Sequence, residues 1–196
     1  MEDSNFQDRT LFKHAVLEKA LIHVSFSGWQ DDVITEALKD LEQDPSSSWR
    51  LFPEGIRDLL EFWSLSLDQK MLEILNQEDT SALKIREKIA LAVQTRIRLL
   101  IPHRDAAIQA SRFFLRPQHA PLALRLVAKT VSEIWYWAGD RSTDYNYYTK
   151  RILLGGVYSS TLAYWLKDTS TDFEKTWIFL NKRIENVLSL SRWKRR

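Results

Sequence analysis

Apolar residues recur every three or four positions along nearly the whole chain, which is the spacing of one face of an α-helix. The clearest run ends at Pro102, which cannot continue a helix, and consists of Ile85, Ile89, Val93, Ile97 and Leu100. The same spacing, interrupted by Gly, Pro and polar turns, predicts further helices over about 11–27, 32–41, 45–52, 53–76, 105–115, 121–138, 143–167 and 173–190. No segment alternates convincingly as a strand would. The pattern therefore predicts an all-α fold of about nine helices.

Three predicted helices in the first 52 residues precede a longer helical body. This arrangement is similar to that of the TetR family, in which a helix-turn-helix unit precedes an all-α body that binds ligands and dimerises. The resemblance implies a three-helix unit over 1–52 and a ligand-binding and partner-binding body over 53–196, with a homodimer as the expected assembly.

The charge of the front unit argues against DNA binding. Residues 1–50 contain ten acidic and five basic side chains, a net charge of −5, and the recognition-helix position (45–52) offers only Arg50 as a cation. Because DNA affinity depends on Lys and Arg that neutralise phosphates, a net-negative unit gains no attraction to the duplex. We therefore expect no nucleic-acid partner, and a TetR-type ligand-responsive transcription regulator is the alternative interpretation.

Composition narrows the chemistry further. The 196 residues include no Cys, which excludes disulfides, thiolate nucleophiles and Cys-ligated metals. The four His lack the His-Glu-x-x-His and Glu-x-x-His spacings of metal sites, and no nucleotide-binding glycine motif is present. We expect a non-enzymatic protein without a cofactor. No apolar run reaches 18 residues, and the start, Met1-Glu2-Asp3-Ser4, is acidic and lacks an apolar stretch. We expect a bacterial cytoplasmic protein or a processed mature form, with a peripheral position at the inner face of the membrane as an alternative.

Aromatic residues are concentrated in 135–151, which reads as a helix end, a tight turn at Gly139 and the start of another helix. The rings of this segment point in different directions around a helix, so some of them must be exposed or covered by another chain. Exposed Tyr and Trp beside Asp and Arg are typical of protein–protein contacts. The alternative is a capped turn whose rings lie in the core.

This segment closely resembles the signature of the ubiquinone-biosynthesis accessory family, lipid-binding proteins with a TetR-like fold. The positions that match are Trp135, Ala138, Gly139, Asp140, Ser142, Asp144, Asn146, Tyr148, Thr149, Lys150 and Arg151. Further likeness occurs at 96–102 and 172–177, and the similarity extends from about Leu17 to Leu190.

The resemblance implies a non-catalytic protein that binds a polyprenyl quinone precursor or a similar isoprenoid lipid. It would present that lipid to the di-iron hydroxylase that acts on demethoxyubiquinone. The partner-binding residues implied by the family motif are Trp137, Asp144, Tyr147 and Tyr148. At position 147 relatives often carry Trp, so Tyr147 keeps the ring with less area to bury.

A lipid pocket would lie between the long helices, with Phe113, Leu124, Val127, Trp135 and Leu153 as the expected lining. Small residues share one face of the helix over 143–167, with Gly155, Ser159 and Ala163 in line. They would allow either close helix packing, including a dimer contact, or room for a bound chain. Basic residues around Trp193 at the C-terminal end suit either a membrane surface or a helix end whose cations complement the dipole.

Overall fold

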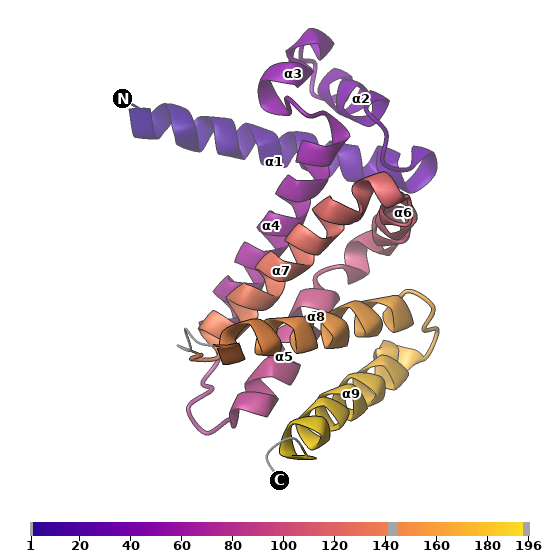
Figure 1. The fold of residues 1–196 in the computed structure, drawn as a ribbon. Coiled ribbons are helices and arrows are strands. Elements are labelled where there is room, and N and C mark those ends of the chain that lie inside the picture. The colour runs from indigo at the N-terminus through magenta and orange to yellow at the C-terminus, as the bar shows by residue number, and fades with distance from the viewer. Residues whose placement is uncertain (1, 141–144, 194–196) are drawn as a thin grey trace. The chain divides into compact units, whose positions relative to one another are not determined.

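The computed structural model describes residues 2–140 and 145–193, and within these residues every regular element is helical (Figure 1). The α-helices are α1 (Glu2–Ser27), α2 (Asp32–Asp40), α3 (Ser48–Leu51), α4 (Ile56–Leu75), α5 (Ile85–Arg98), α6 (Arg104–Phe114), α7 (Ala120–Trp137), α8 (Tyr145–Trp165) and α9 (Glu174–Trp193). Short 3₁₀ turns precede α3, α6, α7 and α9. The prediction of an all-α fold with about nine helices is confirmed.

The chain forms two compact units. The first unit contains the residues up to Leu65 together with His103–Ala120, and the second contains Ser66–Pro102 and the residues from Pro121 onward. Helix α4 contributes to both units. The predicted division into 1–52 and 53–196 rests on the TetR resemblance and stays a prediction.

In the first unit, α1 is a long helix of 26 residues rather than one of three short ones. Its buried positions Val16, Ala20 and Val24 are four residues apart, so they form one stripe against α2. Trp29 follows the turn at Gly28 and stacks on Trp63 at 5.1 Å between ring centroids. Burial of these side chains organises the core of this unit.

Helix α4 begins at Ile56, three residues later than the position predicted from Pro53. The Ile56 amide donates to Oδ1 of Asp31 at 2.7 Å, and Gly55 turns the chain into the helix with φ +62°. A Cβ atom at Gly55 would collide with the Asp31 carboxylate. The start of α4 is therefore fixed by a residue 25 positions earlier in the chain.

In the second unit, a buried polar cluster joins α4, α5 and α7. Arg96 donates from Nε to Asp68 Oδ1 at 2.6 Å, and the Thr130 hydroxyl donates to the same carboxylate at 2.9 Å. Burial lowers the pKa of Arg96, but nearby Tyr158 and Asp68 outweigh this effect and hold the pKa above its ordinary value. These contacts link the three helices, and removal of either charge would leave the other buried without compensation.

Helix α9 is capped by Asp168, which follows the end of α8. Its carboxylate accepts from the Thr176 amide at 2.9 Å and from the Ser170 amide at 2.8 Å, and from both hydroxyls. Burial raises the pKa of Asp168, but these hydrogen bonds outweigh burial, so the pKa lies well below its ordinary value.

Candidate functional site

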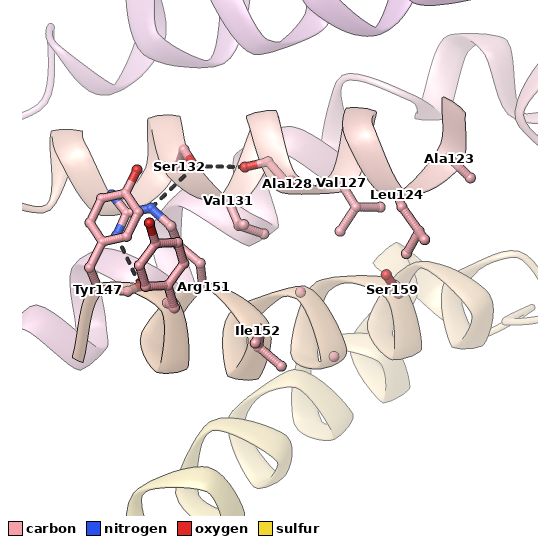
Figure 2. A pocket seen from close by; sticks show the side chains of 13 residues that line it. Ala123, Leu124, Val127, Ala128, Val131, Ser132, Tyr147, Arg151, Ile152 and Ser159 are labelled. Carbon is pink, nitrogen blue, oxygen red and sulfur yellow. Dashed lines mark hydrogen bonds between the residues drawn. The ribbon is translucent and has the colours of Figure 1, made fainter. Parts of the chain in front are cut away.

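A groove with a volume of about 690 Å³ runs between α7 and α8 in the second unit (Figure 2). Its lining is Ala123, Leu124, Val127, Ala128, Val131, Ser132, Tyr147, Tyr148, Arg151, Ile152, Gly155, Gly156 and Ser159. Arg151 is the one charged residue among these thirteen described residues. The groove is therefore an apolar trough with a single cation in its wall.

The spacing of the lining residues shows how two amphipathic helices form the walls. On α7 the lining positions 124, 127, 128 and 131 recur every three or four residues, and on α8 so do 148, 152, 155 and 159. A Cβ atom at Gly155 would contact Val127 Cγ1 at 3.5 Å, whereas one at Gly156 would meet nothing within 4 Å. The glycine at 156 thus leaves open space in the groove.

The edges of the groove expose large apolar side chains. Leu124 is 71% exposed, Ile152 is 75% exposed and Tyr148 is 67% exposed. A cluster of such side chains is costly in water and commonly marks a surface that binds a partner or a ligand.

At the end of α7, Gly139 turns the chain with φ +92°, a conformation that favours glycine. The Asp140 amide donates to the Trp135 carbonyl at 2.9 Å, and the Gly139 amide donates to the Tyr136 carbonyl at 3.1 Å. These two bonds form a Schellman motif. The tight turn predicted from the sequence is present.

The Asp140 side chain is 7% exposed and connects the end of α7 to α8. Its carboxylate lies 2.6 Å from Lys150 Nζ and 3.5 Å from Arg151 Nη1. Both cations come from the first two turns of α8. The Gly-Asp and Lys-Arg pairs of the sequence motif therefore lie together at the junction of the two helices.

Arg151 makes three further contacts that fix its guanidinium group. Nε donates to Ser132 Oγ on α7 at 3.2 Å, and Nη1 donates to the Tyr147 carbonyl at 3.2 Å (Figure 2). The guanidinium carbon lies 3.3 Å from the centroid of the Tyr147 ring. Arg151 thus fixes both the alignment of α8 on α7 and the orientation of the Tyr147 ring.

The structure separates the four residues predicted to bind a partner. Tyr148 is exposed, and Tyr147 is half-buried beneath the Arg151 guanidinium; the two rings are 5.2 Å apart. Trp137 is half-buried in the last turn of α7. Asp144 lies outside the described residues. The exposed ring on α7 is Tyr136, which we did not select from the sequence.

Of the five residues predicted to bind lipid, Leu124 and Val127 line the groove. Trp135 donates from Nε1 to the Lys150 carbonyl at 3.2 Å and belongs to the helix junction. Leu153 is half-buried on α8, and Phe113 is buried on α6 in the first unit, where it stacks on His119. Lipid contact at these five positions stays a prediction.

Sequence reasoning missed Ser132 and Ile152 as lining residues and gave Arg151 no role in the groove. A signal existed, because positions 148, 152, 155 and 159 share one helical face. Ala163, which we placed on the small-residue face, is exposed and is not among the lining residues.

The part of the chain that the structure describes contains neither a candidate membrane span nor a candidate metal site. In residues 2–140 and 145–193, no helix has both the length and the hydropathy needed to cross a bilayer. In the same residues, no three His, Asp or Glu side chains gather in a way that could hold a metal ion. The C-terminal side chains predicted to contact membrane, Arg192 to Arg196, lie outside the described part.

In its fold the chain is a TetR-like protein. It is similar to the crystal structure of a TetR transcriptional regulator from Nitrosomonas europaea, with a TM-score of 0.72 and 18% sequence identity. The alignment covers 93% of this chain and 98% of the regulator. At this identity the likeness shows the fold alone.

The sequence comparisons identify the family. The COQ9 family model matches residues 120–191, which contain both helices of the groove. The chain is 32% identical to ubiquinone biosynthesis protein COQ9-B of Xenopus laevis, with 96% of this chain and 67% of that protein covered. It is 31% identical to COQ9 of Rattus norvegicus, with 96% of this chain and 62% of that protein covered. The chain belongs to the COQ9 family.

These relatives are longer than this chain. The chain spans 62% of the length of the rat and Xenopus tropicalis proteins, which are named as mitochondrial ubiquinone biosynthesis proteins. The bacterial cytoplasmic location expected from the sequence stays a prediction.

Proposed function

We propose that this chain acts in ubiquinone biosynthesis as a non-catalytic lipid-binding protein. It binds a polyprenyl quinone precursor in the groove between α7 and α8 and presents it to the di-iron hydroxylase that acts on demethoxyubiquinone. Membership of the COQ9 family supports the pathway, because the relatives are named as ubiquinone biosynthesis proteins.

The observation that carries this proposal is the continuity of two predicted surfaces. Leu124 and Val127, predicted from the sequence as lipid contacts, line the same groove as Tyr147 and Tyr148, predicted as partner contacts. A chain lying in this groove would therefore end beside the ring at which the partner docks. This arrangement suits handing over a ligand better than storing it in a closed interior.

The lining can supply the binding energy for an apolar chain. Each methylene group moved from water to an apolar surface contributes about 0.8 kcal/mol, so about ten buried isoprenoid carbons contribute about 8 kcal/mol, which is comparable to the cost of association of about 4–15 kcal/mol. Ser132 and Ser159 are the hydroxyl-bearing residues of the lining apart from the two tyrosines. An isoprenoid tail needs no hydrogen-bond partner along its length.

Tyr148 has the features of a partner anchor. It is an amphipathic ring, 67% exposed, beside the exposed side chain of Ile152. Burying such a ring at the centre of an interface typically contributes more than its neighbours do. Tyr147 is less available, because its ring is covered by Arg151 on one face.

The proposal is tested with purified protein and purified hydroxylase. Mass spectrometry of the organic extract should detect an isoprenoid quinone precursor, and the protein should increase hydroxylase turnover. Tyr148→Ala should reduce hydroxylase binding at least tenfold, as expected for a hot-spot ring. The melting temperature should hardly change because the side chain is exposed.

Trp49→Ala is the matched control, since Trp49 is an exposed ring on α3 in the first unit and should have no effect. Equal hydroxylase affinity of the Tyr148→Ala and parent proteins would contradict the partner assignment. Tight, salt-sensitive binding to duplex DNA would instead favour a transcription regulator.

A further inference from the structure

The single cation of the groove lies at the junction of α7 and α8, where four of the five polar residues of the lining gather; Ser159 lies towards the other end (Figure 2). Ser132, Tyr147 and Arg151 meet there, while the lining further along α7 consists of Ala123, Leu124, Val127 and Ala128 (Figure 2). The groove is thus amphipathic along its length, with a polar end and an apolar end.

Two cations of α8 contact the Asp140 carboxylate at the polar end. The carboxylate lies closer to Lys150, at 2.6 Å, than to Arg151, at 3.5 Å. Arg151, at 14% exposure, is the cation that reaches the groove.

The guanidinium group is also oriented for in-plane hydrogen bonding. It stacks face-on with the Tyr147 ring, so its N–H groups point outward around the edge of the plane. The Ser132, Tyr147 and Asp140 contacts engage Nε and Nη1. A guanidinium held in this way recognises a carboxylate, phenolate or phosphate oxygen more strongly than a neutral group.

We propose that the Arg151 end of the groove is a head-group subsite, in which the Nη2 edge donates to an anionic oxygen at the end of an apolar chain. The ligand class is an amphiphile with one anionic or strongly hydrogen-bond-accepting head, and its tail lies along Val127, Ile152 and Gly156. This inference rests on the proposed function, because it specifies which lipids the same groove selects.

Displacement of the neutral dye Nile red by three ligands that share one alkyl chain tests the subsite. Laurate carries a carboxylate, whereas lauryl alcohol and methyl laurate carry neutral heads. On the full chain, laurate should bind roughly tenfold or more tightly than either neutral ligand, the effect of a hydrogen bond to a charged group.

Arg151→Met should abolish this preference, so that laurate binds the variant no more tightly than methyl laurate does, because the charged donor is lost while the apolar wall remains. Arg151→Lys, which keeps the charge but loses the planar stack, should keep part of the preference. Lys129→Met is the matched control: it removes an exposed positive charge from α7 at a position outside the lining, and the preference should persist.

The outcomes separate the subsite from the proposed function. If all three ligands bind equally to the parent protein, or if Arg151→Met keeps the preference for laurate, the subsite is wrong and lipid binding in the groove still stands. If none of the ligands displaces the dye, both the subsite and lipid binding in the groove are wrong. The comparison of laurate with methyl laurate uses the parent protein, so it decides the question even if Arg151→Met fails to fold.

Discussion

Replacing Gly156 with leucine should stabilise the protein while it blocks the groove. Gly156 lies in the interior of α8 and is exposed, and a Cβ atom there would have no neighbour within 4 Å. Stability should rise and lipid affinity should fall, so this single variant distinguishes a lipid-binding groove from an ordinary part of the surface.

The gain in stability follows from helix propensity. Glycine in an exposed helix interior costs about 1 kcal/mol relative to alanine, and leucine is close to alanine on this scale. For a chain of this size, about 1 kcal/mol corresponds to a rise in melting temperature of about 2–4 °C. A Cβ atom at position 156 would meet no neighbour within 4 Å, so the first carbon of the new side chain adds no steric cost.

The loss of binding follows from the space that the leucine side chain takes. If it excludes two or three methylene groups of a bound chain, the ligand loses about 2 kcal/mol, or roughly a thirtyfold increase in Kd. Gly156→Ala is the control. It should give the same stabilisation with a much smaller loss of affinity, because a single methyl group takes little of the groove.

Thermal unfolding by circular dichroism and Nile red titration measure the two effects, and analytical ultracentrifugation follows the oligomeric state. A stabilised Gly156→Leu variant that still binds lipid at parental affinity would refute the groove as the lipid site. A destabilised variant that also loses a dimer would show that a second chain packs against Gly156. That outcome would favour the helix-packing alternative for the small residues of α8.

Two further predictions concern the second unit. Asp68→Leu should lower the free energy of unfolding by about 3–5 kcal/mol, because Arg96 would keep a buried charge without its partner. The double variant Asp68→Leu/Arg96→Met should recover most of this loss in thermal unfolding. Equal free energies of unfolding for the single and double variants would contradict this reasoning. Asp168, with its lowered pKa, stabilises the fold above its ordinary pKa of 3.8, and this contribution is lost as the pH falls below that value towards the pKa of the folded state. Asp168→Asn should therefore lose less stability than the parent between neutral and strongly acidic pH, as measured by urea titration at a series of pH values, and parallel curves would rule out this role.

The helices themselves could be predicted from the sequence because their signals are local. The run from Ile85 to Pro102 and the turn at Gly139 were both read directly from spacing and residue type. The start of α4 could not be predicted in this way. It depends on a hydrogen bond from Asp31, which lies in another segment of the chain.

The groove was only partly predictable, because a core and a ligand site present the same apolar stripes. Ile152 and Leu153 are adjacent and both apolar, and the difference between them is one step of about 100° around α8. Phe113 has a strongly apolar pattern as well, yet it packs within the first unit. The tyrosines show the same limit of pattern reading: Tyr147 and Tyr148 are chemically alike, and the stacking of Arg151 on one of them decides which ring remains available.

The buried contact between Thr130 and Asp68 has a consequence for how this family can diversify. Thr130 precedes the groove residue Val131 on α7, and α7 forms one wall of the groove. The contact between Thr130 and Asp68 therefore influences the position of α7 along its axis and its rotation about that axis. Under the proposed function, a substitution at Asp68 or Arg96 would shift that wall and change the length of chain that fits, although both residues lie outside the lining. Ligand preference could then be changed from the interior without any substitution at Tyr148, the proposed partner contact.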